Sequence, residues 1–208
     1  HHFPKRKIYK QGEPIRIIHH CTPWRGLNVL LLAMQMLKST HVTLDVYSSC
    51  NVYGSEFAKD HEEAFNPIYE QAKSLDNVNY IGFKSNEYIL EHMSDYDLFV
   101  YPPIFEETFC ASALEALAAG VHVITTNFGA LPETCAEWPV YVNYSQNHEL
   151  LAASFAQAIE VAIAYLHTDD IQNHLEEQQK YYKRFYNWNK KGQEWTNFLK
   201  GALRVKGL

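Results

Sequence analysis

The stretch Tyr101–Glu133, YPPIFEETFCASALEALAAGVHVITTNFGALPE, carries the clearest signal of the fold of this chain. It begins at the end of an apolar segment, Leu98–Tyr101, that predicts a strand. After a loop, the sequence rich in Ala and Leu predicts a helix that ends at Gly120. A second apolar strand is predicted directly afterwards, at Val121–Thr125. Strand, loop, helix and strand in this order are typical of a βαβ unit in a parallel sheet.

Two glutamates flank the start of this helix. Glu107 lies in the loop and Glu115 lies eight residues later inside the helix, so a helical rise separates their backbones by about 12 Å. That length suits a ligand with two polar ends and a phosphate bridge between them. Four backbone N–H groups at the helix start favour a diphosphate, those of Thr108, Phe109, Cys110 and Ala111. Without a ligand, acidic residues near a helix start also favour the helix dipole, so spacing alone leaves both interpretations open.

The same stretch resembles the donor-binding region of the family-4 retaining glycosyltransferases, which have the GT-B fold. Their signature has Glu, seven residues and Glu, then Ala, a small residue, Gly, an apolar strand, and a Gly with Pro-Glu after it. In this chain these elements are Glu107, Glu115, Ala116, Gly120, VHVIT and Gly129–Glu133. The family usually has Gly-Phe-Gly where this chain has Thr108, Phe109 and Cys110. Loss of both glycines changes how closely a sugar and a phosphate approach the backbone.

A basic residue, Arg25, precedes a glycine in the loop after the first predicted strand, Ile15–His20. An apolar helix is predicted after it, at Leu27–Leu37. A cation between a parallel strand and a helix is typical of a phosphate site, since the helix dipole disfavours the cation without an anion. The resemblance implies that Arg25 holds the donor diphosphate. Another Arg is often found earlier in this loop, where the chain has His19 and His20, which we expect to be packing residues.

The remaining elements continue the alternation of strands and helices. Strands are predicted at Val42–Tyr47, Val78–Ile81 and Val140–Asn143, and a loop at Asn51–Ser55. Helices are predicted at Ser55–Leu75 with a break at Asn66-Pro67, from the cap Ser85 to Met93, at Leu150–Leu166, at Asp169–Phe185 and in the Trp-containing C-terminal sequence. The fold class is therefore α/β, a Rossmann-like open parallel sheet of about six strands with helices on both faces.

Phe83 and Lys84 follow the strand Val78–Ile81 and its glycine. In the family that this chain resembles, the backbone at this point contacts the edge of the nucleotide base. The resemblance therefore implies a base-binding role for the two residues, although a place for Phe83 in the core is left open. The identity of the base does not follow from these residues, and a UDP- or GDP-sugar is expected.

The composition is that of a soluble globular protein, with 208 residues, 47% hydrophobic and 20% charged. A formal net charge of −6 argues against nucleic-acid binding. Four dispersed cysteines without a C-x-x-C pair favour reduced thiols and a cytoplasmic protein. No apolar run reaches the roughly 20 residues that span a bilayer, and no signal peptide is evident. Peripheral membrane contact of a longer protein is left open, and the basic-aromatic run KYYKRFYNWNKK is expected to face a partner domain.

The resemblance also implies a division of the chain. Residues 1–14 are expected to be a tag remnant and linker, with His1 and His2 from the tag. Residues 15–186 are expected to form the nucleotide-sugar-binding domain, and residues 187–208 a helix that packs toward an N-terminal acceptor domain. GT-B enzymes have two Rossmann-like domains, and the resemblance covers only the C-terminal one. We expect the chain alone to bind nucleotide without transferring sugar at a useful rate.

The reaction implied is transfer of a sugar from a nucleoside-diphosphate sugar to a hydroxyl of a glycan or other acceptor, with retention of configuration. Arg25 and the amides of residues 108–111 would stabilise the leaving diphosphate without a metal ion. Glu107 would orient the sugar and Glu115 the ribose hydroxyls. A glycosidase is excluded because its two carboxylates flank one bond at about 5 to 9.5 Å. The alternatives left open are a non-hydrolysing nucleotide-sugar epimerase and a non-catalytic assembly module.

Overall fold

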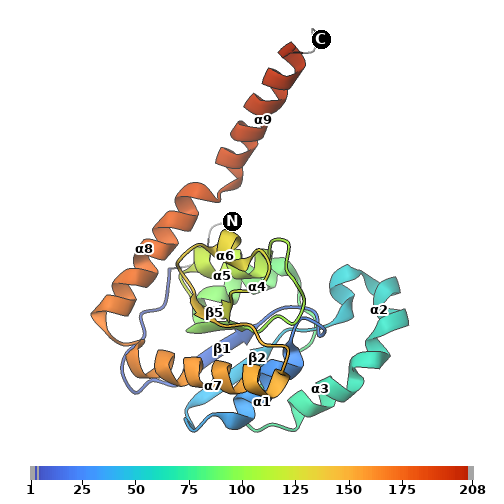
Figure 1. The fold of residues 1–208 in the computed structure, drawn as a ribbon, viewed down its shortest axis with the longest axis vertical. Coiled ribbons are helices and arrows are strands. Elements are labelled where there is room, and N and C mark those ends of the chain that lie inside the picture. Colours follow the sequence, from blue (N-terminus) through green and yellow to red (C-terminus); the bar gives the residue numbers. More distant parts are fainter. Residues whose placement is uncertain (1–2, 4, 206–208) are drawn as a thin grey trace.

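A parallel sheet lies at the centre of the computed structural model, which describes residue 3 and residues 5–205 (Figure 1). Within these residues six strands pair in the order β3-β2-β1-β4-β5-β6. The strands are β1 (Ile15–His19), β2 (Val42–Val46), β3 (Val78–Tyr80), β4 (Leu98–Tyr101), β5 (His122–Thr126) and β6 (Val140–Val142). All five pairings are parallel. The predicted α/β, Rossmann-like fold is confirmed.

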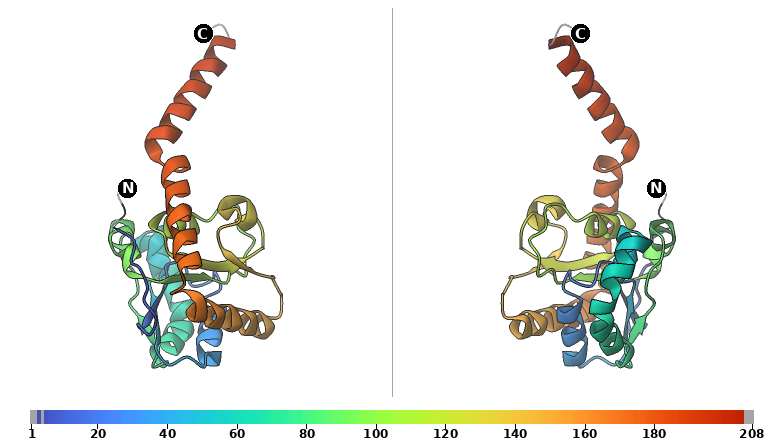
Figure 2. Two further views of the ribbon diagram at one scale, coloured as in Figure 1. Left: turned by 90° about the vertical axis from the view of Figure 1, so that its left-hand side faces the viewer. Right: turned by 90° about the vertical axis from the view of Figure 1, so that its right-hand side faces the viewer.

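Helices cover both faces of the sheet (Figures 1 and 2). One face packs against α1 (Leu27–Met36) and α7 (His148–Tyr165). The other packs against α4 (Asn86–His92), α5 (Ala111–Ala119) and α8 (Asp169–Phe185). The remaining helices are α2 (Ser55–His61), α3 (Asn66–Lys73), α6 (Leu131–Cys135), α9 (Trp188–Val205) and the short 3₁₀ helices η1 (Cys50–Tyr53), η2 (Glu62–Phe65) and η3 (Met93–Asp95).

The central strand β4 is apolar throughout because both of its faces are buried. In β4, Leu98 and Val100 pack into the layer under α1 and α7, whereas Phe99 and Tyr101 pack into the layer under α5. This alternation follows from the two-residue repeat of a strand. It brings a tyrosine to the last position of β4, on the α5 side of the sheet.

Local signals in the sequence set several helix boundaries correctly. The predicted helix Ser55–Leu75 is divided, and Pro67 lies in the first turn of α3, where its missing N–H is not needed. The hydroxyl of Ser85 accepts a hydrogen bond from the Tyr88 N–H at 3.3 Å, so Ser85 is the predicted N-cap of α4.

Two short helices differ from the prediction. The predicted loop Asn51–Ser55 is largely occupied by η1, whose start is capped by the Ser49 hydroxyl. Helix α6 was not predicted, although Pro132 in its first turn is a typical helix-start residue. Both helices are too short to show a hydrophobic repeat, which is why the sequence pattern did not reveal them.

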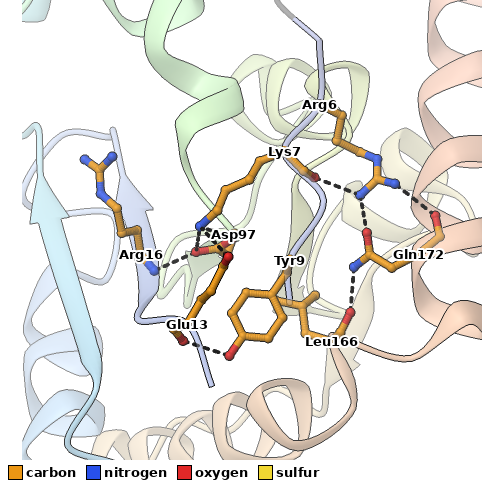
Figure 3. Close-up of polar contacts among 8 residues, drawn as sticks. All are labelled: Arg6, Lys7, Tyr9, Glu13, Arg16, Asp97, Leu166 and Gln172. Carbon is orange, nitrogen blue, oxygen red and sulfur yellow. Dashed lines mark hydrogen bonds and ion pairs between the residues drawn. The ribbon is translucent and has the colours of Figure 1, made fainter. Parts of the chain in front are cut away.

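Residues 5–14, which we call the N-terminal strap, pack against the domain (Figure 3). Lys7 forms an ion pair with Asp97 at 3.0 Å, and Arg6 donates to the side-chain oxygen of Gln172 at 2.7 Å. Tyr9 is buried, and its hydroxyl donates to the Glu13 carbonyl at 2.8 Å. The segment predicted to be a linker therefore contributes packing and polar contacts. The predicted tag residues His1 and His2 lie outside the described residues.

Helix α9 projects away from the rest of the chain (Figures 1 and 2). It exposes large apolar side chains, those of Trp188, Trp195, Phe198, Leu199 and Leu203. Among the described residues no helix is by itself long and apolar enough to cross a bilayer. Helix α7 and the α8–α9 segment, which meet at a bend of 106°, together have the length and composition of a broken membrane span, and only these two criteria support one.

Candidate functional site

The order of the sheet creates a switch point between β1 and β4. The chain leaves β1 for α1 on one face and leaves β4 for α5 on the other, so the two loops diverge. A crevice outside the carboxyl ends of such strands is the usual ligand site of an open α/β sheet. The two loops at this crevice are those that carry Arg25 and Glu107.

Close backbone approaches hold the loops of this edge together. Gly26 has φ +93°, and a Cβ atom there would collide with the carbonyl oxygen of Pro102. Gly129 has φ +61°, and a Cβ atom there would lie 2.6 Å from the Glu107 carbonyl oxygen. That oxygen accepts a hydrogen bond from the Ala130 N–H at 2.8 Å. The backbone of Glu107 is therefore fixed by the neighbouring loop.

The side chains of Arg25 and Glu107, 82 positions apart in the sequence, form an ion pair from Nη1 to Oε1. The Glu107 side chain is 9% exposed and that of Arg25 is 21% exposed. The guanidinium carbon of Arg25 also lies 4.4 Å from the centroid of the exposed Phe105 ring. Burial lowers the pKa of Arg25, but Glu107 and Tyr101 outweigh it and raise the pKa. The structure thus brings together the two predicted catalytic residues.

Tyr101 is a member of the site that the sequence analysis missed. Its hydroxyl donates a hydrogen bond to the same Oε1 atom of Glu107. Burial raises the pKa of Tyr101, and the neighbouring Cys21, Cys110 and Glu107 side chains raise it further, so the hydroxyl keeps its proton and remains a donor. Its place at the end of a predicted buried strand could have indicated this role, because a buried tyrosine hydroxyl needs a hydrogen-bond partner.

Glu115 lies on α5 and contacts the start of α4. Its carboxylate accepts a hydrogen bond from Asn86 Nδ2 at 3.2 Å, and burial raises its pKa. Phe83 and Lys84 precede α4 in the same loop region, and both are exposed. Phe83, at 45% exposure, is therefore not a core residue. Asn86 links the predicted ribose-binding glutamate to the loop predicted to contact the base.

The start of α5 differs from the prediction. The helix begins at Ala111, and Cys110 is its N-cap with φ +84°. The backbone from Glu107 to Cys110 is not helical, so the helical rise that we applied to the whole interval up to Glu115 is wrong. Three residues at this helix start are exposed, namely Thr108, Phe109 and Ala111, and Cys110 is partly buried. Their N–H groups follow Glu107 directly in the sequence, and N–H groups at the start of a helix favour an anion.

His19, the last residue of β1, is fully buried, and His20, directly after the strand, is partly buried. Burial lowers the pKa of His19 to about 4 and, with the effect of His19, that of His20 to about 3. Both imidazoles are therefore neutral near pH 7, as expected for packing residues. Burial also raises the pKa of Cys21 to about 12, so its thiol carries no negative charge there. The positive charge that this loop offers at neutral pH is that of Arg25.

The sheet order and the two loops at its switch point place the chain in the class of doubly wound, Rossmann-like α/β proteins. Residues 1–186 match the family described as glycosyl transferases group 1, and the chain belongs to this family. The family match ends two residues before the start of α9. A search of curated protein sequences gave no match.

Solved structures share this fold at low sequence identity. A glycosyltransferase from Rickettsia africae ESF-5 is 21% identical with a TM-score of 0.71, over 93% of this chain and 48% of that one. Sucrose-phosphate synthase from Thermosynechococcus elongatus is 20% identical with a TM-score of 0.68, over 98% and 52%. Anabaena Alr3699/HepE, solved with UDP and glucose, is 16% identical with a TM-score of 0.67, over 91% and 48%. The chain thus spans about half the length of these proteins.

Proposed function

We propose that this chain is the donor-binding half of a retaining glycosyltransferase. It binds a nucleoside-diphosphate sugar, and together with an acceptor-binding domain it moves the sugar to a hydroxyl group. The observation that carries this proposal is the pairing of Arg25 with Glu107 beside the α5 N-terminus, at the switch point of the sheet. The family match and the UDP and glucose in the HepE structure support it.

The proposed diphosphate site consists of Arg25 and the amides of residues 108–111. A guanidinium presents a planar fork of N–H donors that suits phosphate as well as carboxylate. A diphosphate carries more negative charge than the Glu107 carboxylate, so it competes for Arg25 when it binds. Stabilisation of this charge is also what the reaction needs when the glycosidic bond breaks.

The two glutamates are proposed to bind the ends of the donor. Glu107 orients hydroxyls of the sugar, and Glu115 accepts hydrogen bonds from the ribose hydroxyls. Phe83 and Lys84 then lie at the base, because Asn86 connects their loop to Glu115. The UDP in the HepE structure favours a UDP-sugar over a GDP-sugar as the donor.

The acceptor half is proposed to be a second, N-terminal domain. The chain spans about half of its structural relatives, and α9 exposes an apolar surface away from its own domain (Figure 2). Large apolar patches on a soluble domain mark surfaces that another domain or protein covers. Without that half, the chain binds nucleotide but transfers little sugar. Its four unpaired cysteines fit a cytoplasmic location.

Calorimetry of the chain with UDP, GDP, ADP and TDP tests the proposal. One nucleotide is expected to bind, and Arg25→Ala is expected to weaken it about 10- to 100-fold because a charge-assisted contact is lost. Glu115→Ala is expected to weaken it about 10-fold. Arg184→Ala and Glu70→Ala remove exposed charges on α8 and α3, and should change the affinity less than about twofold. The proposal is overturned if no nucleotide binds at millimolar concentration, in which case an assembly module is the better account.

A further inference from the structure

Tyr101 holds Glu107 from a rigid part of the molecule. It is the last residue of β4, a central strand, and it is 1% exposed. Its ring packs against Phe99 with a centroid distance of 6.0 Å, and its carbonyl oxygen accepts a hydrogen bond from the Thr125 hydroxyl at 2.9 Å. Both the ring and the backbone of Tyr101 are therefore fixed by the core.

Arg25, the second donor to Glu107, has a different setting. It belongs to the loop between β1 and α1, and its side chain is 21% exposed and lies against the exposed ring of Phe105. A long side chain on a loop changes partner at lower cost than a tyrosine packed in a sheet. Of the two donors, Arg25 is the one free to move onto an incoming anion.

Departure of Arg25 would leave a carboxylate that is only 9% exposed. A buried carboxylate without a partner is strongly unfavourable, so Glu107 needs another donor at that moment. The Tyr101 hydroxyl supplies one at Oε1. Because the Glu107 backbone is held by Ala130 at 2.8 Å, the carboxylate is then fixed at both ends, with Oε2 left for a ligand.

We infer that Tyr101 is the positioning residue for Glu107 in donor binding. When the diphosphate takes Arg25, Tyr101 keeps its hydrogen bond to Oε1 and orients Oε2 toward a hydroxyl of the donor sugar. This role rests on the proposed donor-binding function and adds a residue to it. Tyr101 itself touches neither the sugar nor the diphosphate, and it acts through Glu107.

Binding of UDP and UDP-glucose to the chain, with and without Tyr101→Phe, tests this role; GDP and GDP-mannose replace them if GDP binds more tightly. The affinity for free nucleotide should change less than about twofold, whereas the ratio of nucleotide-sugar affinity to nucleotide affinity should fall about 5- to 20-fold. Tyr182→Phe is the matched control, since Tyr182 is equally buried but donates to the Cys135 carbonyl and not to Glu107. It should leave the ratio unchanged.

A double-mutant cycle in urea unfolding, with Tyr101→Phe and Glu107→Ala, tests the contact without a ligand. The combined change in the unfolding equilibrium constant should differ from the product of the single changes by about 5-fold or more. Independent changes, or an equal loss of nucleotide and nucleotide-sugar affinity in Tyr101→Phe, would overturn the role of Tyr101 alone. Absence of nucleotide binding by the unmodified chain would instead overturn the proposed function.

Discussion

Two regions of this molecule each hold a buried carboxylate beside a cation. At the N-terminal strap, Asp97 is 5% exposed and pairs with Lys7 at 3.0 Å (Figure 3). At the switch point, Glu107 is 9% exposed and pairs with Arg25. The charge pattern is the same in both regions, but the remaining partners differ.

Asp97 uses both of its carboxylate oxygens for partners that belong to the fold. Oδ2 accepts a hydrogen bond from the Arg16 backbone N–H at 2.9 Å and one from Lys7 at 3.2 Å, and Oδ1 pairs with Lys7 at 3.0 Å. The two donors to Glu107 are side chains, and both bond the same oxygen, Oε1. A backbone N–H in a strand cannot leave its partner, whereas a side chain on a loop can. The strap region is therefore a structural lock, whereas the switch-point region is suited to an exchange of partners with a ligand.

Protonation of buried histidines should have the largest effect on stability, and such histidines occur in both regions. His19 and His20 lie at the switch point, and His122 lies beside Asp97, whose carbonyl accepts the His122 N–H at 3.1 Å. Burial lowers the pKa of His122 to about 4, as it does that of His19. The unfolded chain binds protons on these residues below pH 6.5 and the folded chain does not, so stability is full above pH 6.5 and is lost as the pH falls toward 4.

Urea unfolding at a series of pH values should therefore show a loss of several kcal/mol between pH 6.5 and 4. Near pH 5 each histidine contributes a slope of about 1.4 kcal/mol per pH unit. His122→Gln and His19→Gln should each lower the proton uptake on unfolding by about one, which tests the two regions separately. A slope that neither variant changes would contradict the buried, neutral state of these residues.

A glycine with positive φ lies in each of the two regions, so the effect of adding a Cβ atom can be compared between them. Gly12 in the strap and Gly26 at the switch point have φ +85° and +93°, but a Cβ atom on Gly12 meets nothing within 4 Å, and one on Gly26 collides with Pro102. Gly12→Ala should lower the free energy of unfolding by about 1–2 kcal/mol through backbone strain alone. Gly26→Ala should lower it by more than about 3 kcal/mol. Equal losses in denaturant unfolding would show that the loop contact is absent in solution.

Substitution of each carboxylate by its isosteric amide allows Asp97 and Glu107 to be compared directly. Asp97→Asn places an N–H₂ group against one of the two donors, so it should lower the free energy of unfolding by about 1–3 kcal/mol. Glu107→Gln can keep an oxygen toward Arg25 and Tyr101, so it should change stability by less than about 1 kcal/mol. In calorimetry, Glu107→Gln should nevertheless weaken nucleotide-sugar binding, whereas Asp97→Asn should not. The opposite pattern would reverse our assignment of lock and site.

Substitution of Cys110, at the start of α5, should give the smallest change in the free energy of unfolding. Its φ of +84° is strained for a residue with a side chain, and glycine adopts this conformation freely. Cys110→Gly should raise the free energy of unfolding by about 0.5–1 kcal/mol, after the greater entropy of glycine in the unfolded chain is subtracted. Cys110→Ala is the control, because it removes the thiol and keeps the strain. A gain in stability with alanine would point to the thiol instead.

Elements with a local cause could be predicted from the sequence alone. Runs of apolar residues predicted the buried strands, Pro67 predicted a helix boundary, and Ser85 predicted an N-cap. The spacing of Glu107 and Glu115 located the candidate site on one βαβ unit. Such signals lie within a few residues of each other, so they can be recognised without knowledge of the fold.

The contacts between residues far apart in the sequence depend on the tertiary structure. Lys7 and Asp97 are 90 positions apart, and Arg25 and Glu107 are 82 positions apart. The strand order brings β1 beside β4, and this neighbourhood alone places the Arg25 loop against the Glu107 loop. The hydrogen bond from Tyr101 further depends on which face of β4 the tyrosine occupies and on the irregular backbone before α5. Periodicity predicts the face of a residue, but the partner that it meets there is set by the packing of the whole sheet.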